Sequence, residues 1–300
     1  MRAARFHEYG TPEVLSIEDA AEPHAGPGAV RIRVLAASVN PIDVLLRGGV
    51  LRAALPLALP AIPGRDAVGV VDEVGPGATG TNVGDVVFGL GGVSDTTAEF
   101  AVLTAWSDVP ENWTVEQSAA AGLASATAAR AVFALGDLDG RTLLVEGAGG
   151  AVGSAAAAFA RAAGARVVGT ARPAKHDQLA AAGVEPTSYG PGLADRVRAL
   201  APQGVDAAIH AAPSPSLADL LEIVGDTTRV VTVVDAQGAA RLGVRHVNAA
   251  NESALLEYAA DLGRRGLYLP RVDRVVPLAS IQEAHALAES GSGKIVVSLT

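Results

Sequence analysis

The segment 142–171 reads TLLVEGAGGAVGSAAAAFARAAGARVVGTA, and its order of residues is the strongest indication of the fold. An apolar run at 142–145 precedes a glycine-rich turn at 147–150, and an alanine-rich stretch suited to a helix follows. Gly164 then leads into a second apolar run at 166–170. This order predicts a strand, a helix and a strand, with glycines where a backbone must approach a diphosphate closely. The amino end of the helix would offer unpaired amides to that diphosphate, so the segment predicts a dinucleotide-binding unit.

The glycines of this turn align with dinucleotide-binding fingerprints in two ways. Gly147, Gly149 and Gly153 form G-x-G-x-x-x-G, whereas Ala148, Gly150 and Gly153 form A-x-G-x-x-G. The second alignment keeps the last glycine at the spacing needed for close packing of the helix on the strand. A flexible turn that caps a helix in another α/β protein is the alternative. The flanking strand, helix and strand favour the nucleotide site.

Composition indicates a soluble globular protein. A chain of 300 residues, 49% of them hydrophobic, can bury a large core in one or two domains. The net charge of −9 without runs of like charge makes a nucleic-acid partner unexpected. The absence of cysteine excludes disulfides, thiolate nucleophiles and cysteine-ligated metals. Neither a signal core nor a membrane-spanning stretch is expected, which predicts a cytoplasmic location.

The character of the sequence changes near residue 115. Before it, short predicted strands at 29–35, 69–74, 86–88 and 99–102 are separated by proline and glycine turns, which favours a β-rich domain. Beyond it, predicted helices alternate with predicted strands, as expected for a doubly wound parallel sheet. The helices are predicted at 115–135, 152–163, 175–182, 193–200 and 217–224, and the strands at 143–146, 166–170, 207–210 and 229–233. The end returns to strands at 272–276 and 294–299 around a helix at 281–290. We therefore predict one domain from 1–115 and 267–300, interrupted by another at 116–266.

A series of motifs resembles a known family nearly end to end. The motifs are VNPID at 39–43 with Arg47 and Gly48, PGRD at 63–66 with Gly69 and GDV at 84–86, TAEF at 97–100, Thr127-Ala128, the loop 148–153, and VDRV at 272–275 with His285 and GKIV at 293–296. In this order they are similar to the medium-chain dehydrogenase/reductases, and among these to the zinc-free, quinone oxidoreductase-like (zeta-crystallin-like) branch. The resemblance implies a GroES-like β-rich substrate domain, a Rossmann domain that binds NADPH, an active site in the cleft between them, and a homodimer.

The metal-ligand positions of the zinc-dependent relatives are altered in this chain. Those relatives carry Cys-His-x-Asp where residues 40–43 read Asn-Pro-Ile-Asp, and Gly-His-Glu where residues 64–66 read Gly-Arg-Asp. Asn40 and Arg65 do not suit a zinc site. A catalytic metal is therefore not expected.

The residues after the second strand of the unit favour NADPH. Residues 169–175 contain no acid of the kind that binds the ribose 2′-hydroxyl of NAD, but they contain Arg172 and Lys175. These cations could donate charge-assisted hydrogen bonds to a 2′-phosphate, or they could be ordinary solvated charges at a helix start. The resemblance adds Tyr189, at the border of the same phosphate, and Lys294. The predicted cofactor-binding residues are Ala148, Gly149, Gly150, Ala151, Val152, Gly153, Thr170, Arg172, Lys175, Tyr189 and Lys294.

Asn40 and Thr127 are the predicted catalytic residues. The resemblance implies that Asn40 donates a hydrogen bond near the nicotinamide and substrate and that Thr127 lines the nicotinamide pocket, although Asn40 could instead be a turn residue before Pro41. A quinone or an α,β-unsaturated carbonyl spreads developing charge through conjugation and needs no metal. We therefore predict an NADPH-dependent reductase of such acceptors, with the proton taken from solvent. A specialised cyclic imine or enoyl intermediate as substrate, or a weakly catalytic NADPH-binding protein, are the alternatives.

Three segments depart from the family or leave a choice open. The family tyrosine after the RxG motif is missing, and the apolar segment 51–62 that follows could line the substrate or pack the β-domain, with packing favoured. His210 replaces a family aspartate and could titrate near the cofactor, although a hydrogen-bonded histidine at the edge of the core is favoured. Residues 245–253, which include His246 and Asn248, could reach the active site or supply a helix N-cap at Asn251 or Ser253.

Overall fold

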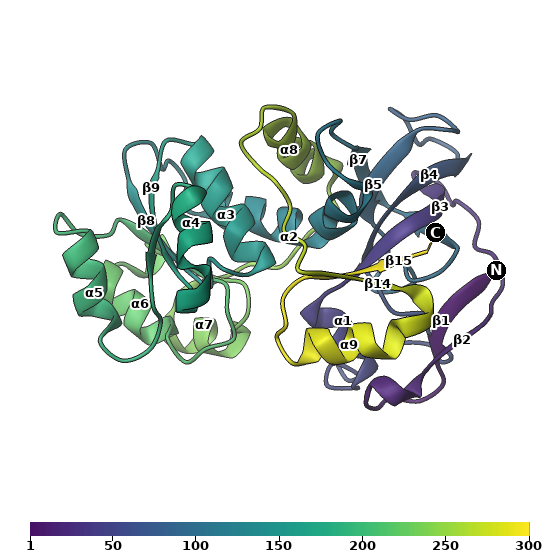
Figure 1. The fold of residues 1–300 in the computed structure, drawn as a ribbon, viewed down its shortest axis with the longest axis horizontal. Helices are drawn as coiled ribbons and strands as arrows, with labels where there is room; N and C mark the ends of the chain where they lie inside the picture. Colours follow the sequence, from purple (N-terminus) through teal and green to yellow (C-terminus); the bar gives the residue numbers. More distant parts are fainter. Residues whose placement is uncertain (300) are drawn as a thin grey trace. The chain divides into compact units, whose positions relative to one another are not determined.

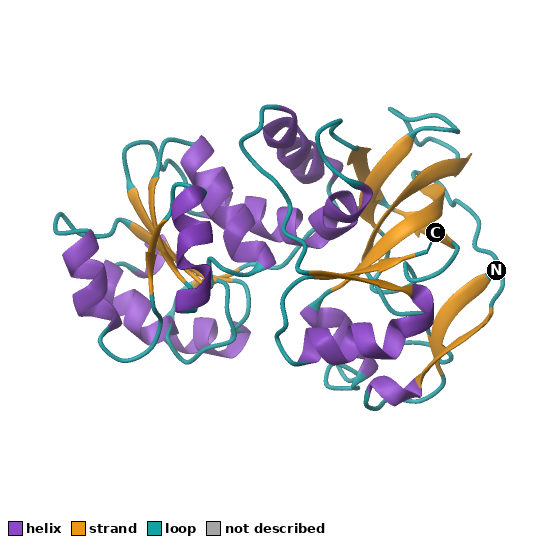
Figure 2. Ribbon diagram, viewed as in Figure 1, coloured by secondary structure: helices purple, strands orange, loops and turns teal. Residues whose placement is uncertain are grey.

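The computed structural model describes residues 1–299 as two compact units. The first unit contains residues 1–123, 251–264 and the chain from 269 onward, and the second contains 124–250 and 265–268. One unit is β-rich and the other is a parallel sheet with helices, so the predicted fold class is confirmed (Figures 1 and 2). The domain limits predicted at 115/116 and 266/267 stay a prediction.

The first unit is built on a seven-stranded sheet in the order β14-β15-β3-β4-β5-β7, with β6 paired to β3. Its strands are β3 (Val30–Val39), β4 (Asp66–Val74), β5 (Val86–Leu90), β6 (Phe100–Leu103), β7 (Ala105–Asp108), β14 (Arg274–Pro277) and β15 (Ile295–Ser298). All pairs are antiparallel except β14 with β15. A separate antiparallel pair is formed by β1 (Arg2–Phe6) and β2 (Leu15–Asp19). The last strand of the chain, β15, therefore lies inside the sheet between β14 and β3.

Three helices and two short 3₁₀ turns complete the first unit. They are α1 (Pro41–Arg47), α8 (Ser253–Arg264), α9 (Ile281–Glu289), η1 (Pro12–Val14) and η4 (Leu278–Ser280). The face of α9 that carries Ile281 and Ala284 packs with Phe6 and Val297 in one core cluster. The sequence did not predict α1, which begins at a proline and is closed by a capping box between Asn40 and Asp43.

The second unit contains a six-stranded parallel sheet in the order β10-β9-β8-β11-β12-β13. Its strands are β8 (Thr142–Glu146), β9 (Arg166–Thr170), β10 (Glu185–Thr187), β11 (Ala207–His210), β12 (Val230–Thr232) and β13 (Arg245–His246). Numbered along the unit, this is the order 3-2-1-4-5-6 of the doubly wound Rossmann fold. The order reverses between β8 and β11, so dinucleotide binding is expected outside the carboxyl ends of these two strands.

The helices of the second unit connect the parallel strands. They are α2 (Val115–Ala134), which starts in the first unit, α3 (Ala151–Ala162), α4 (His176–Ala181), α5 (Leu193–Leu200), α6 (Leu217–Val224) and α7 (Ala236–Leu242), with 3₁₀ turns η2 (Pro173–Lys175) and η3 (Thr227–Arg229). Leu144 and Val230 from the sheet pack with Val197 and Leu220 from the helices in a continuous core. Within residues 1–299, no helix is both long and apolar enough to span a membrane.

A buried arginine and a buried histidine lie between α1 and α9 in the first unit. Arg47 and His285 are each 1% exposed. Arg47 Nη2 donates to Glu289 Oε2 at 3.2 Å, while Nδ1 of His285 has no hydrogen-bond partner among the described residues. Burial first, and the Arg47 charge second, lower the pKa of His285 to about 3. His285 is therefore neutral in the folded protein at all ordinary pH values.

The replacement His285→Leu is expected to flatten the acid limb of the stability profile. The unfolded chain protonates this histidine near its ordinary pKa of 6.5, whereas the folded protein does not until about pH 3. The stabilising contribution is therefore present above pH 6.5 and is lost as the pH falls toward 3, by up to about 1.4 kcal/mol per pH unit. Urea unfolding between pH 7 and 4 measures the slope. His24→Leu, at an exposed site, is the control, and equal slopes for all three proteins would contradict the assignment.

Candidate functional site

The glycine turn after β8 is shaped by contacts that a side chain would block. Gly147 has a φ of 83°, and a Cβ there would lie 2.8 Å from the Cβ of Ala212. Its amide donates to Thr170 Oγ1 at 3.0 Å, which joins the ends of β8 and β9, and its carbonyl accepts from the amide of Gly150 at 2.9 Å. These contacts hold the turn in one closed shape, in which position 147 has room only for a glycine.

Gly153 lets α3 begin directly on this turn. A Cβ at Gly153 would collide with the carbonyl group of Gly147, so a larger residue would push the helix away. Gly150 is the N-cap of α3 and, as a glycine, has no side chain to accept from the first amides of the helix. The first amides of α3 and the glycine backbone together form a cradle whose three glycines contribute no side chains, which fits the diphosphate of a dinucleotide.

The ends of β9 and β10 bring the other predicted cofactor residues near each other in the sheet. Thr170 pairs in register with Thr187, and the amide of Ala171 donates to the Thr187 carbonyl at 2.9 Å. Arg172 and Tyr189 follow these two strand ends, and both are exposed, Tyr189 by 52%. The adjacent strands therefore present a cation and a phenol at one edge of the sheet.

Lys175 lies closer to the glycine turn than the sequence implied. Its Nζ donates to the carbonyl oxygen of Gly149 at 3.0 Å, and its side chain is partly buried. Lys175 therefore links η2 to the turn and leaves its charge beside the cradle. Its predicted contact with a 2′-phosphate stays a prediction.

A buried polar chain at the topological switch point was missed in the sequence. Glu146 and His210 end the adjacent strands β8 and β11, stand in register, and are 1% and 0% exposed. Ser214, in the loop after β11, donates to Glu146 Oε1 at 3.0 Å and lies 3.2 Å from His210 Nε2. On the other side, Thr232 Oγ1 lies 2.9 Å from His210 Nδ1. These hydrogen bonds connect the carboxyl ends of three neighbouring strands, β8, β11 and β12.

The hydrogen-bond directions assign one tautomer to His210. Thr232 Oγ1 accepts from the amides of Val234 and Asp235, so its hydrogen points to His210 Nδ1. Nε2 then carries the hydrogen of the neutral ring and faces Ser214. Burial lowers the pKa of His210, although the neighbouring carboxylate of Glu146 opposes this. The expected hydrogen-bonded histidine is what the structure shows. In the sequence, Glu146 stands alone at the end of the apolar run TLLVE, and this position could have indicated that it needs a buried polar partner such as His210.

In the first unit, Asn40 belongs to a buried network around Asp66. Asn40 Nδ2 donates to Asp66 Oδ1 at 2.9 Å, and Lys294 Nζ donates to Asn40 Oδ1 at 2.6 Å. The amide orientation follows from its partners, because an ammonium only donates and a carboxylate only accepts. Ser38 Oγ also donates to Asp66, and the amide of Leu123 donates to Asp66 Oδ2 at 2.9 Å. Asn40 is 4% exposed, so its amide serves this network, and its contact with a substrate stays a prediction.

Asp43 holds the backbone of Asn40. Its Oδ2 accepts from the Asn40 amide at 2.8 Å, while Oδ1 is buried without a partner among the described residues. Burial raises the pKa of Asp43 to about 7, and the nearby Asp66 adds to this effect. Asp43 therefore fixes the point where β3 gives way to α1.

Lys294 is the cation of this network. It is 5% exposed, and its Nζ lies 3.9 Å from Asp66 Oδ2. Burial lowers its pKa, whereas Asp66 and Asp43 oppose that shift. The structure thus places Lys294 in the first unit beside Asn40, and its predicted cofactor contact stays a prediction. Thr127 lies in α2 within the second unit and is 8% exposed.

The two altered metal-ligand positions carry groups that make other contacts. The Asn40 amide is bonded as above, and Arg65 Nε donates to the Gly92 carbonyl at 3.2 Å while Nη2 donates to Asn251 Oδ1 at 3.3 Å. A guanidinium has no lone pair to offer a metal. Across residues 1–299, no cluster of three or more His, Cys, Asp or Glu side chains is placed to hold a metal ion.

The segments left open by the sequence have structural roles. In the stretch 51–62, Ala61 and Leu57 pack against the core of the first unit, as the packing alternative predicted. Asn251 Nδ2 donates to Thr104 Oγ1 at 2.8 Å, and Ser253 Oγ accepts from the Trp106 amide at 3.1 Å. These two residues therefore attach the start of α8 to the β-rich unit. His246 lies in the edge strand β13.

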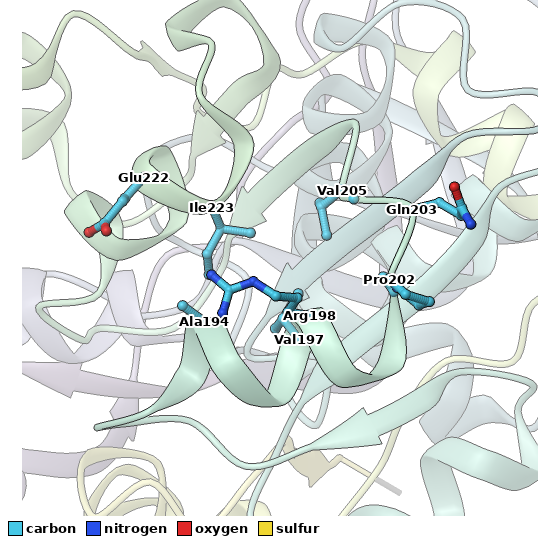
Figure 3. A pocket seen from close by; sticks show the side chains of 10 residues that line it. Ala194, Val197, Arg198, Pro202, Gln203, Val205, Glu222 and Ile223 are labelled. Carbon is cyan, nitrogen blue, oxygen red and sulfur yellow. The ribbon is translucent and has the colours of Figure 1, made fainter.

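One cavity of the second unit lies away from the glycine turn. Its volume is about 340 Å³, and it is lined by residues of α5 and α6 and of the connection 201–205 (Figure 3). That connection leads into the amino end of β11, whereas the glycine turn follows the carboxyl end of β8. The cavity therefore lies at the amino ends of the parallel strands, whereas the nucleotide is expected at their carboxyl ends.

The replacement Lys294→Met is expected to destabilise the protein by about 3–5 kcal/mol, because it leaves the buried Asp66 carboxylate without its cation. Urea unfolding at pH 7 measures the loss. The double variant with Asp66→Asn should recover part of it, since a neutral amide needs no counter-charge. Arg198→Met, which breaks an exposed pair with Asp195, is the control and should cost less than about 1 kcal/mol. A Lys294→Met protein as stable as the control would refute the assigned role.

Comparisons with known proteins agree with this architecture. The Alcohol dehydrogenase GroES-like domain matches residues 26–107, and the Zinc-binding dehydrogenase family matches residues 188–297. A quinone oxidoreductase of Rattus norvegicus is 31% identical, with 98% of this chain and 96% of the relative covered.

Two solved structures with similar folds differ in the cofactor that their descriptions give. One is an NAD-dependent alcohol dehydrogenase, 29% identical with a TM-score of 0.87 over 100% of both chains. The other is a mycobacterial protein complexed with NADPH, 27% identical with a TM-score of 0.83 over 99% of both chains. The full-length relationship to the quinone oxidoreductase, the GroES-like sheet and the Rossmann sheet lead to one conclusion: the chain is an oxidoreductase that belongs to the quinone oxidoreductase-like branch of the medium-chain dehydrogenase/reductases.

Proposed function

We propose that the protein transfers hydride from NADPH to a quinone or an activated α,β-unsaturated carbonyl, without a metal. The observation that carries the cofactor choice is the end of β9, where Arg172 and Lys175 stand in place of an acid. Arg172 is exposed next to the strand end that Tyr189 follows, so both side chains can face a 2′-phosphate. Because similar structures are described with NAD and with NADPH, these residues of the chain itself argue for NADPH.

The choice of acceptor rests on the chemistry of the altered ligand positions. When bound, NADPH supplies the hydride, and a proton must reach the reduced acceptor. A simple carbonyl needs strong polarisation of its oxygen, whereas a conjugated acceptor delocalises the developing charge. Asn40 and Arg65 provide no metal ligand, and Asn40 is fixed by Asp66 and Lys294 in one orientation. This supports a conjugated acceptor. The homodimer implied by the resemblance and the cytoplasmic location expected from the sequence stay predictions.

Oxidation of NADPH with a panel of acceptors tests the function. Purified protein is expected to reduce benzoquinones, naphthoquinones or enones while leaving simple aldehydes and ketones untouched, because only the former spread charge without a Lewis acid. Loss of absorbance at 340 nm measures the rate. Selective turnover of cyclic imines or enoyl thioesters would favour a biosynthetic substrate. Tight NADPH binding without oxidation across the whole panel would contradict an enzymatic role.

The replacement Arg172→Asp is expected to weaken NADPH binding by about ten- to a hundredfold, because a charged hydrogen bond is worth roughly 1.5–3 kcal/mol and is replaced by repulsion. NADH carries no 2′-phosphate, so its affinity should change little. Calorimetric titration of both cofactors measures the ratio. Arg241→Asp, at an exposed position at the end of α7, makes the same change in net charge and serves as the control. An unaltered NADPH affinity would exclude Arg172 from the site.

A further inference from the structure

Arg196 organises the loop that carries Tyr189. Its guanidinium lies within hydrogen-bond distance of the carbonyl oxygens of four consecutive residues, 188–191, and the two hydrogens of Nη2 are shared among three of these oxygens. Nη1 reaches Pro191 at 2.7 Å, and Nη2 reaches Ser188, Tyr189 and Gly190 at 3.0, 3.3 and 3.1 Å. Nε adds a second contact to Ser188 at 3.3 Å. One side chain thus contacts the carbonyl groups of all four residues.

The loop needs such a partner because, among the described residues, only the Gly190 carbonyl of residues 188–191 also accepts from a backbone amide, that of Leu193 at 3.1 Å. It leaves β10 after Thr187 and contains Pro191, which has no amide hydrogen to donate. Gly190 and the following Gly192 have φ values of 87° and 77°, so the backbone has unusual freedom in the unfolded chain. Carbonyl oxygens that leave a sheet must find other donors. The planar fork of an arginine presents several donors in fixed directions, which a lysine ammonium does not.

The loop lies where the proposed cofactor carries its distinguishing phosphate. Thr187 pairs with Thr170, so residues 188 and 189 leave the sheet beside the segment that contains Arg172. Tyr189 is 52% exposed and is not needed for the core. A side chain that is already in place when the ligand arrives loses less conformational entropy on binding. An ordered loop therefore makes Tyr189 available for the 2′-phosphate, whereas a disordered loop would not.

We propose that Arg196 is a positioning residue for cofactor specificity, which sets the 188–191 loop so that Tyr189 and Arg172 together receive the 2′-phosphate of NADPH. This inference rests on the proposed NADPH function. Arg196 contacts the loop backbone and acts through Tyr189. Its removal should therefore weaken NADPH more than NADH and should leave the rest of the unit folded.

The test compares Arg196→Gln and Arg196→Lys with Arg198→Gln, a change two residues further along the same helix, where Arg198 Nη1 contacts the exposed Asp195. Both changes at Arg196 should weaken NADPH by about tenfold and NADH by less than about twofold, the scale of one well-placed polar contact. Arg198→Gln should leave both affinities unchanged. Calorimetric titration measures the affinities, and thermal unfolding confirms that each variant folds. Equal losses for the two cofactors, or an Arg196→Lys protein that behaves as the wild type, would overturn the proposal.

Hydrogen exchange gives a readout that does not depend on the cofactor. Amides of residues 188–190 and 192 should exchange faster in Arg196→Gln than in the wild type and in Arg198→Gln, while α3 and the glycine turn stay protected. Unchanged exchange in this segment would contradict the role of Arg196 in ordering the loop.

A double-mutant cycle with Tyr189→Ala tests whether Arg196 acts through Tyr189. The loss of NADPH affinity caused by Tyr189→Ala should be smaller in the Arg196→Gln background than in the wild type. Additive losses would overturn the link. If the wild type binds NADPH and NADH equally, the proposed function itself fails. If it prefers NADPH and this preference survives Arg196→Gln, only the role of Arg196 fails.

Discussion

The first unit depends on the burial of one carboxylate. Asp66 is 0% exposed at the start of β4, and it accepts hydrogen bonds from Ser38 in β3, Asn40 before α1 and the amide of Leu123 in α2. Lys294, just before β15, supplies the opposite charge. An unpaired buried carboxylate costs several kcal/mol, so the segments that carry these donors must reach their places together. The position of Asn40 is one result of this shared requirement.

The secondary structure of the second unit was largely readable from the sequence, whereas that of the first was less so. Apolar runs at 143–146, 166–170 and 207–210 are strands buried on both faces, bounded by glycine turns, and their residue pattern alone identifies them. Helix α1 shows the contrary case. It has only seven residues, too few for a helical period, and its starting proline resembles a turn signal. Its capping box depends on the side chain of Asp43, whose spacing to Asn40 was visible but was attributed to a family motif.

The candidate site divides in the same way. The glycine turn and Arg172 belong to one continuous stretch of sequence, so a single strand–helix–strand unit brings them to the same end of the sheet. The partners of Asp66 and of Glu146 come from distant segments: Lys294 follows Asp66 by more than two hundred residues, and His210 reaches Glu146 only because β8 and β11 are neighbours across the strand-order reversal. A lone charged residue in an apolar run indicates that a partner is needed, but only the sheet order shows which residue it is.

The internal place of β15 in the sheet sets an order of events during synthesis. The ribosome makes residues 1–123 first and the whole Rossmann segment 124–250 next, and only then the strands β14 and β15. Until these emerge, β3 lacks its partner β15 along residues 36–39, and the carboxyl groups of Asp43 and Asp66 lack the ammonium group of Lys294. The inserted unit can fold as its strands appear, whereas the unit that begins the chain is completed last. A nascent chain of this protein therefore exposes one edge of the first unit's sheet until the inserted unit has been made, and an unpaired strand edge of this kind is prone to pair with other chains.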